Sequence, residues 1–344
     1  MPAGTCATLA TPHAPGAIAV IQLHAAPPSD VFEPIALLTG RDDWAPGRCR
    51  LAAILDRDAI GAIDDAVVVL LDRSRATIMP HGGPRIVQRI LERLAQLGVT
   101  IVASDAIDPC AAFPEAVDRF EALMLATLAR AESPLAIDLL LDQPRRWRAA
   151  LASARSRGAP WIVSDDDRAR SLRLSRLIVP PSVVLVGAPN IGKSTLVNTL
   201  AGRPVALASD RPGTTRDHVG VALELEGLAV HWHDTPGLRE TDDAIEREAH
   251  RLALRTMESA DLLVVAADAT TGWPATPRAP DLRVGLRSDL GGREDVDVRV
   301  SARTGEGIRA LVRAVRDALV PPADLADRGP WLFDDRLLAA SATR

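Results

Sequence analysis

The residues best suited to chemistry lie in one run near the middle of the chain, Gly187-Ala188-Pro189-Asn190-Ile191-Gly192-Lys193-Ser194-Thr195. The run matches the G-x-x-x-x-G-K-[ST] pattern, in which glycines let backbone amides point at phosphate oxygens and the serine hydroxyl binds Mg²⁺. Lys193 is the only lysine in a chain of 344 residues whose lysines and arginines total 40. A lysine ammonium is a compact charge that fits between two phosphates, whereas an arginine guanidinium is a wide planar fork. The run therefore predicts a phosphate-binding loop whose nucleotide contacts are Gly187, Asn190, Ile191, Gly192, Lys193, Ser194 and Thr195.

Two further motifs follow in the order that a nucleoside triphosphate site with Mg²⁺ requires. In Asp234-Thr235-Pro236-Gly237, we expect Asp234 to hold Mg²⁺ through water and the Gly237 amide to meet a γ-phosphate. Thr235 lies between them in the same motif and is expected to contact the nucleotide. The segment Pro212-Gly213-Thr214-Thr215-Arg216-Asp217 precedes this motif. A threonine there can bind the metal only while the γ-phosphate is present, so Thr215 predicts a switch.

Alternating strand and helix patterns must position these motifs. Apolar runs predict strands at 183–186, 219–225, 228–232, 262–266, 282–286 and 296–300, and helices at 195–200 and 308–319. Glu226-Gly227 predicts a hairpin turn between the second and third strands. Residues 267–281 are rich in Thr, Gly and Pro, so we expect a loop or a single helical turn at this crossover. The alternation predicts an α/β fold over residues 179–320, with a doubly wound, mostly parallel sheet.

The chain before residue 179 predicts two further parts. Residues 1–110 combine strands at 17–23, 66–71 and 99–102 with a helix at 84–97 that Gly98 ends, which indicates an α+β domain. Residues 111–178 are expected to be helical over 116–131 and 135–154, with Pro134 and Pro144 as interruptions. Val179-Pro180-Pro181 indicates a domain junction, and residues 321–344 remain as a C-terminal tail.

Composition narrows the class of protein. The net charge of −5 provides no overall basic field for nucleic acid. An RNA contact would need a local patch of arginines. The alternative is that these arginines lie on solvated helix faces. The candidates are Arg145, Arg146, Arg148, Arg155, Arg157, Arg168, Arg170, Arg173 and Arg176. Three scattered cysteines without metal spacing indicate a reducing cytosol. No apolar run approaches the roughly 18 residues of a membrane helix, and no signal peptide is evident, so we expect a cytoplasmic protein.

Together, the three nucleotide motifs resemble those of the TrmE/MnmE–Era–Der GTPases. Ala10-Thr11-Pro12, followed by Gly16-Ala17-Ile18-Ala19-Val20-Ile21, resembles the opening of the MnmE/TrmE tRNA-modification GTPases. His81-Gly82-Gly83-Pro84 before a helix resembles that family's His-Gly-Gly segment. The likeness covers most of the chain, tightly in 183–237 and loosely elsewhere. It implies a P-loop GTPase domain after an α+β N-terminal domain and a helical segment, with GTP and Mg²⁺ as ligands and hydrolysis of GTP as the activity.

The resemblance also implies catalytic roles for individual residues. In that family the loop asparagine helps to bind a K⁺ ion that substitutes for an arginine finger, a role that falls on Asn190; a loop-stabilising amide is the alternative. The family's water-orienting glutamate falls on Glu246, for which an exposed helix carboxylate is the alternative. With Thr215 on the metal, these residues form the expected catalytic set.

Base recognition departs from the family pattern. The family's Asn-Lys-x-Asp stands here as Leu286-Arg287-Ser288-Asp289. Asp289 can still accept the guanine N1–H and amino protons, and Ser301-Ala302 fits the next base-contact motif. A lost base contact costs roughly 1–3 kcal/mol, so we expect a guanine preference that is retained but weaker.

Two other departures concern the chemistry beyond GTP. The family ends in a helical bundle with a Cys-x-Gly-Lys motif that its tRNA chemistry needs, whereas this sequence has no cysteine after Cys110 and no lysine besides Lys193. At the family's folate cleft, Gly-Arg-Gly is replaced by Ala14-Pro15-Gly16 and a strand arginine by Gln22. These changes argue against one-carbon folate, and His81 could line a remnant cleft or cap a turn.

The resemblance implies a homodimer formed through the N-terminal domain. For modification of the tRNA wobble uridine it further implies tRNA and an FAD-containing partner. Two alternatives remain open: a GTP-dependent switch or assembly factor, and a slow nucleotide-binding interaction module without tRNA-modifying activity.

Overall fold

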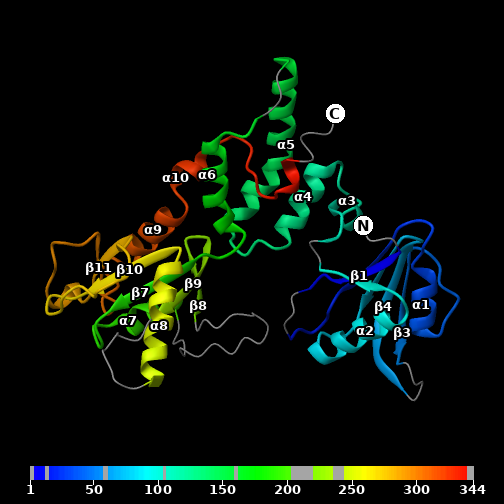
Figure 1. The fold of residues 1–344 in the computed structure, drawn as a ribbon, viewed down its shortest axis with the longest axis horizontal. Helices are drawn as coiled ribbons and strands as arrows, with labels where there is room; N and C mark the ends of the chain where they lie inside the picture. Colours follow the sequence, from blue (N-terminus) through cyan, green and yellow to red (C-terminus); the bar gives the residue numbers. More distant parts are fainter. Residues whose placement is uncertain are drawn as a thin grey trace. The chain divides into compact units, whose positions relative to one another are not determined.

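The computed structural model describes residues 4–11, 15–56, 61–103, 106–158, 162–202, 220–234 and 244–338 (Figure 1). The chain forms two compact units, and the boundary between them falls at Pro114 and Glu115. Among the described helices, none combines the length and the apolar composition needed to cross a membrane.

The N-terminal unit is built on one six-stranded sheet with the order β3-β4-β5-β2-β1-β6. Neighbouring strands are antiparallel, except that β1 and β6 are parallel. The strands are β1 (Thr5–Leu9), β2 (Ile21–Ala25), β3 (Arg48–Leu55), β4 (Ala62–Asp72), β5 (Arg75–Met79) and β6 (Thr100–Ile101). The helices are α1 (Phe32–Thr39), α2 (Pro84–Gln96) and the short α3 (Pro109–Ala112).

One face of this sheet forms the core of the N-terminal unit. Alternate residues of β4 are buried there, because side chains along a strand point to opposite faces of the sheet. Ile90 and Leu94 of α2 and Ile35 and Leu38 of α1 belong to the same cluster. The helix predicted at 84–97 is confirmed, and Gly98 after it has a positive φ of 84°.

The strand expected at 17–23 begins later, at Ile21, and this part of the prediction is wrong. The backbone before Ile21 pairs instead with the turn that precedes α2: the Ala19 amide donates to the Pro80 carbonyl at 2.9 Å and the Gly82 amide to the Ala17 carbonyl at 3.1 Å. A Cβ on Gly82 would lie 2.5 Å from the Gly16 carbonyl oxygen, so this close approach requires glycine.

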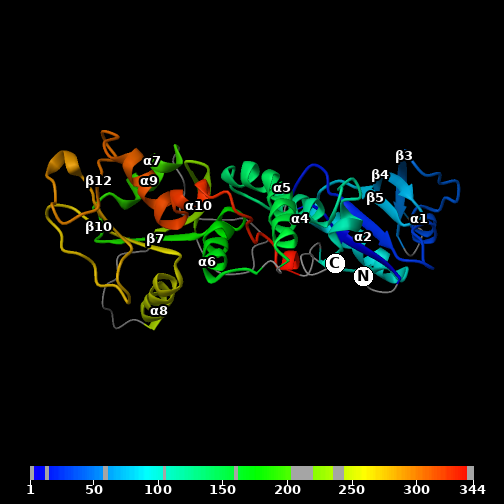
Figure 2. The same cartoon turned by 90° about the horizontal axis from the view of Figure 1, so that it is seen from above.

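The second unit contains the predicted doubly wound α/β sheet, with the order β12-β11-β10-β7-β9-β8. Figure 2 labels β12, β10 and β7 of this sheet. All neighbouring strands are parallel except β8 and β9. The strands are β7 (Ser182–Gly187), β8 (Val221–Leu225), β9 (Leu228–Asp234), β10 (Leu262–Ala267), β11 (Leu282–Gly285) and β12 (Val298–Arg299). Helices α7 (Lys193–Ala201) and α9 (Ile308–Leu319) pack on one face, and α8 (Ala244–Ser259) packs on the other.

Two connections in this sheet match the sequence prediction. Glu226 and Gly227 form the β8–β9 turn with φ of 47° and 86°, the left-handed pair that a tight hairpin needs. The crossover between β10 and β11 contains no helix. Instead, Trp273 lies under the guanidinium of Arg293, 4.6 Å from the ring centroid, and donates to Asp295 at 2.7 Å.

Helices α4 (Arg119–Leu128), α5 (Leu135–Ser156) and α6 (Asp165–Leu174) complete the second unit together with the C-terminal segment, which includes α10 (Pro322–Ala326). Pro144 does not interrupt α5, contrary to expectation. A proline removes a helical hydrogen bond, and the neighbouring Gln143 contributes others: its Nε2 donates to the Leu139 carbonyl at 3.1 Å and its Oε1 accepts from the Trp331 amide at 2.7 Å. The C-terminal segment thus contacts α5 through a hydrogen bond next to Pro144.

Candidate nucleotide site

The phosphate loop connects β7 to α7 at the carboxyl edge of the parallel sheet, where α/β folds bind ligands. Gly187 ends the strand, and a Cβ there would lie 2.5 Å from the Ala266 carbonyl oxygen of the neighbouring strand. Gly192 has a φ of 102° and is the N-cap of α7. The glycines of the motif therefore stand where the fold leaves no space for a side chain or requires a left-handed backbone.

Lys193 is held against the loop that precedes it. Its ammonium donates to the carbonyl oxygens of Gly187 and Ala188, both at 3.0 Å, and the residue is 8% exposed. The buried stem and the two carbonyl contacts fix the charge beside the loop. Since Lys193, Ser194 and Thr195 form the first turn of α7, the partial positive charge of the helix N-terminus adds to that of the lysine. This arrangement suits a phosphate group.

The metal-side motif begins beside the phosphate loop. Asp234 is the last residue of β9, and it pairs in register with Leu185 of β7, two residues before Gly187. The side chain of Asp234 lies outside the described residues, as do Thr215, Thr235 and Gly237. Glu246 falls within α8, but its side chain is likewise outside the description. The positions of these side chains thus remain sequence predictions.

The base-contact residues predicted from the sequence come together at the ends of β11 and β12. Asp289 lies in a short 3₁₀ turn, η3 (Ser288–Leu290), and its Oδ1 accepts from the Ser301 hydroxyl at 2.6 Å. Arg303 donates to Oδ2 of the same carboxylate at 2.9 Å. Hydrogen bonds from Ser301 and then Arg303 hold the pKa of Asp289 below its ordinary value. The carboxylate is therefore ionised at neutral pH, as an acceptor for N–H groups must be.

This base-contact cluster also touches the helix that follows the phosphate loop. The carbonyl oxygen of Ala302 accepts from the Thr199 hydroxyl of α7 at 3.5 Å. Ser301 is fully buried, and its hydroxyl accepts from the Thr304 amide at 3.2 Å while donating to Asp289. The cluster is thus fixed on two sides, by α7 and by its own turn.

Asp268 is a buried residue of this site that sequence patterns did not reveal. It follows β10 directly, is 4% exposed, and lies 3.3 Å from Arg287 across an ion pair. Burial raises the pKa of Asp268, but hydrogen bonds from Thr270 and Thr271 and the charge of Arg287 outweigh it. The pKa of Asp268 therefore lies below its ordinary value. The available signal was an aspartate at the carboxyl end of a fully buried strand, where polar residues often belong to a site.

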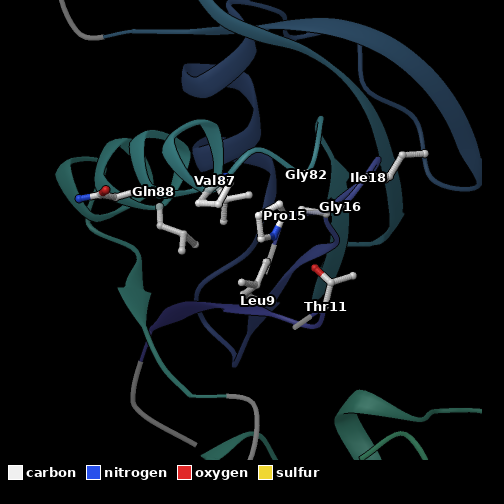
Figure 3. Close-up of a pocket in the computed structure, with 11 residues that line it drawn as sticks. Leu9, Thr11, Pro15, Gly16, Ile18, Gly82, Val87 and Gln88 are labelled. Atoms are coloured by element: carbon white, nitrogen blue, oxygen red, sulfur yellow. The ribbon is translucent and has the colours of Figure 1, made fainter. Parts of the chain in front are cut away.

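A separate cavity of about 470 Å³ lies in the N-terminal unit, between α2 and the segment that precedes β2 (Figure 3). Its lining is mostly apolar: Leu9, Thr11, Pro15, Gly16, Ile18, Ala19, Gly82, Pro84, Val87, Gln88 and Leu91. The Thr11 hydroxyl already accepts from the Val20 amide at 3.2 Å, and the Gln88 amide, which is turned away from Pro15 in Figure 3, donates to Glu92 at 2.9 Å.

A one-carbon folate carries a hydrogen-bonding pterin ring and an anionic tail, and the described lining offers no charged partner for that tail. Among the described residues that line the cavity, none is charged. His81 is not part of the lining either; its Nδ1 lies 2.8 Å from Asp64, and its amide donates to the same carboxylate. The expectation that His81 lines a remnant cleft is therefore not met, whereas the Asp64 contact agrees with a role in the turn.

Several arginines that could have formed an RNA patch contribute to the fold instead. Arg146 lies 2.6 Å from Asp142 and donates to the Asp327 carbonyl at 2.8 Å. Arg173 pairs with Asp324 at 2.6 Å. Their guanidinium groups thus connect α5 and α6 to the C-terminal segment, as the buried Arg170 also does through its contacts with Asp327 and Pro330.

A protein-family comparison agrees with this geometry. Residues 182–284 match the family model described as a 50S ribosome-binding GTPase. This range covers the sheet from β7 to β11 and includes the phosphate loop.

Curated relatives extend the likeness to most of the chain. The tRNA modification GTPase MnmE of Acidiphilium cryptum is 37% identical over 271 residues, which are 69% of this chain and 63% of the relative. An MnmE of Thermus thermophilus is 31% identical over 356 residues, 91% of this chain and 82% of the relative. MnmE of Maricaulis maris is 32% identical over 371 residues, 92% of this chain and 83% of the relative.

Among solved structures, one of Era in complex with 16S ribosomal RNA is 28% identical, with a TM-score of 0.33. That match covers 40% of this chain and 56% of the Era chain.

Proposed function

Because the chain belongs to the MnmE family of tRNA modification GTPases, we propose that it uses GTP binding and hydrolysis as a conformational switch that serves tRNA modification. The observation that supports the nucleotide part best is the buried ammonium of Lys193, which is held by two loop carbonyls at the first turn of a helix. Among the contacts described, the Lys193 ammonium meets two carbonyl oxygens and no carboxylate. Its positive charge is therefore available to a phosphate.

The residues of the site divide the work of hydrolysis between them. Lys193 and the loop amides hold the phosphates, and Ser194, Thr215 and Asp234 would hold Mg²⁺. The metal supplies neutralisation of the charge that develops on the phosphates. Glu246 would orient the attacking water, and Asn190 would bind K⁺. Asp289, Ser301 and Ala302 would bind the guanine.

The nucleotide assignment is tested by replacing the lysine. Lys193→Ala removes the only charge that the described loop directs at the phosphates, so we expect GTP binding measured by calorimetry to fall below detection. A variant that binds GTP as tightly as the wild type would refute the assignment of the phosphate site.

The K⁺ role of Asn190 has its own test. We expect the wild-type hydrolysis rate to be higher in K⁺ than in Na⁺ at equal ionic strength, and Asn190→Ala to remove the difference. Equal rates in the two salts would instead favour the slow nucleotide-binding module.

The link to tRNA modification is a separate proposal, supported by the family and by the extent of the likeness. A homodimer, a cytoplasmic location, and contacts with tRNA and an FAD-containing partner are part of it. Complementation of a strain without its MnmE would support the full enzyme. Failure to complement, with GTP hydrolysis intact, would favour the switch or assembly factor.

A further inference from the structure

The cavity in the N-terminal unit has apolar walls that the core of this unit does not use (Figure 3). Val87 of α2 is 7% exposed and Ala19 is 4% exposed, and both line the cavity. Neither of them belongs to the cluster of buried side chains that forms the core. The cavity is therefore an apolar surface beside the core and separate from it.

Helix α2 presents one of these walls. Four of its residues line the cavity: Pro84, Val87, Gln88 and Leu91. Their spacing of three and four positions places them on one face of the helix. Ile90 and Leu94 belong to the core cluster and lie on the neighbouring face. An amphipathic helix needs one apolar face to pack against its own domain, so the second face, with Val87 and Leu91, is available for another contact.

The segment before β2 presents the other wall. The Gly16 amide donates to the Gly82 carbonyl at 3.2 Å, and the Gly82 amide donates to the Ala17 carbonyl at 3.1 Å. These bonds use polar groups of the backbone within the protein. The side chains that this segment adds to the lining, those of Pro15, Ile18 and Ala19, contain no polar atom. This wall is therefore apolar as well.

Thr11 supplies a polar group to the cavity. Its hydroxyl oxygen accepts from the Val20 amide at 3.2 Å, which fixes the oxygen and leaves its proton for another acceptor. In Figure 3 the Thr11 oxygen points toward Pro15, whereas the Gln88 amide is turned away. Among the described side chains of the lining, Thr11 is thus the donor that a bound molecule would meet.

The charge of the lining decides the class of ligand. Pro15 stands where the resembling family has the arginine of Gly-Arg-Gly, and it lines the cavity. An apolar ring therefore replaces a positive charge at this position. Burying an ionised group without a partner is far more costly than burying an apolar one. The described lining consequently favours an uncharged ligand over an anion.

We propose that this cavity binds an uncharged, mainly apolar small molecule that offers one hydrogen-bond acceptor to Thr11. Its volume of about 470 Å³ is of the size that small-molecule sites have. Contact with Val87 and Leu91 removes apolar surface of the ligand from water, and the hydroxyl of Thr11 orients it. The phosphate loop belongs to the other unit, so the proposal does not depend on the proposed function.

Three two-ring probes of similar shape test the class of ligand on the full chain. Quinoline has one acceptor nitrogen and is uncharged at neutral pH, naphthalene has no acceptor, and 1-naphthoate carries a negative charge. Dissociation constants are measured by saturation-transfer NMR. We expect quinoline to bind about threefold more tightly than naphthalene, because of one hydrogen bond, and at least about tenfold more tightly than 1-naphthoate. The anion 5-formyltetrahydrofolate should not compete with quinoline.

Two variants test the place of binding. Thr11→Val keeps the shape of the side chain and removes its donor, so quinoline should lose its advantage over naphthalene. Leu91→Phe fills the cavity and should weaken binding of both neutral probes at least about tenfold. Leu97→Phe is the matched control and should bind as the wild type does, because Leu97 is also partly buried beside the core but does not line the cavity.

Several outcomes would overturn the proposal. A wild type that binds neither neutral probe would do so, as would tighter binding of 1-naphthoate or 5-formyltetrahydrofolate than of quinoline. Equal losses in Leu91→Phe and Leu97→Phe would place the probes outside the cavity. If circular dichroism shows that Leu91→Phe does not fold, Thr11→Val decides: a preference for quinoline as large as that of the wild type would refute the role of the hydroxyl and the proposal with it.

Discussion

We expect the contribution of Lys193 to GTP binding to depend on the shape of its side chain as well as on its charge. The ammonium lies 3.0 Å from two loop carbonyls while the stem is buried. A guanidinium is wider and cannot occupy the same space without moving the loop. We therefore expect Lys193→Arg, which keeps the charge, to weaken GTP binding at least about a hundredfold in a calorimetric titration, a loss typical of a misplaced charged contact in a closed site. Arg168→Lys, the reverse change at an exposed position of α6, should leave GTP binding unchanged. A Lys193→Arg variant with wild-type affinity would show that charge alone suffices.

Asp289 provides a second prediction, because guanine, the partner proposed for it, has a defined set of donors and acceptors. A carboxylate accepts from two N–H groups, as guanine offers, whereas an amide accepts once and donates once, which suits the carbonyl of xanthine. Asp289→Asn should weaken GTP binding at least about tenfold and strengthen binding of xanthosine triphosphate. Competition between the two nucleotides measures the change. An unaltered preference would mean that the base lies elsewhere.

The site residues that could be predicted are those whose partners are part of a local pattern. The phosphate loop is one contiguous run, so its chemistry and spacing are visible in the sequence. Asp268 and Arg303 could not be recognised in the same way. Asp268 pairs with a residue 19 positions away, and Arg303 with one 14 positions away. Only the parallel sheet, which brings the ends of its strands together, places them in one site.

At the level of elements, the crossover between β10 and β11 shows how a helix can be replaced. Trp273 lies 4.6 Å from Arg293 and 5.7 Å from Arg283, and Arg278 donates to the carbonyls of Met257 and Ala260 at the end of α8. We expect Trp273→Ala to lower the thermal midpoint of the second unit by about 2–4 °C, as a loss of about 1 kcal/mol does in a unit of this size. Arg283→Ala should lower it less, because the exposed Arg283 lies farther from the ring. Scanning calorimetry would measure both, and an unchanged midpoint for Trp273→Ala would show that the indole does not fasten the loop.

The strand β2 carries the residue whose titration should matter for stability. His24 is 4% exposed, and neither ring nitrogen has a hydrogen-bond partner among the residues described. Burial, with Arg75 adding to it and Asp72 opposing, lowers the pKa of His24 below its ordinary value of 6.5. The unfolded chain therefore binds more protons than the folded one below that pH. The stability contributed by the neutral ring is complete above about pH 6.5 and falls as the pH drops through the folded pKa.

Replacement of His24 tests the direction of this pH dependence of stability. His24→Leu removes the titrating ring, so we expect the variant to lose less stability than the wild type between about pH 7 and pH 5.5, the range in which a histidine changes charge. Urea unfolding at a series of pH values gives the comparison. Parallel curves for the two proteins would show that His24 does not set the acid sensitivity of its unit.

Sequence patterns predicted most elements because the periodic spacing of apolar residues and the residue types of turns are local features of the sequence. The helix at 84–97 and the Glu226-Gly227 hairpin are examples. The errors arose where tertiary contacts overrule the local preference. The segment before Ile21 pairs with the backbone next to Pro80, so it does not extend β2. Pro144 is accommodated within α5, where the adjacent Gln143 bonds to the backbone of Trp331 far along the chain.

For the whole molecule, the C-terminal segment belongs to the same core as the nucleotide-binding sheet. Trp331, Phe333 and Leu337 cluster with the helices α4 and α5 and with the strands β7 and β10. Arg146, Arg170 and Arg173, which a sequence cannot distinguish from solvated helix residues, connect to the same segment. The predicted helical segment, sheet and tail therefore share one hydrophobic core, whereas the N-terminal unit has its own.

This division of cores makes a prediction for unfolding. Trp331 is 1% exposed, and its carbonyl oxygen accepts from the indole of Trp147 at 3.0 Å. Removing a buried tryptophan side chain costs about 3–5 kcal/mol, so Trp331→Ala should lower the midpoint of one thermal transition. That transition should be the one that GTP with Mg²⁺ raises, since a ligand stabilises only the unit that binds it. Ile35→Ala, in the core of the N-terminal unit, is the matched control and should lower the other transition. If Trp331→Ala lowered only a transition that nucleotide does not shift, the C-terminal segment would not share the stability of the nucleotide site.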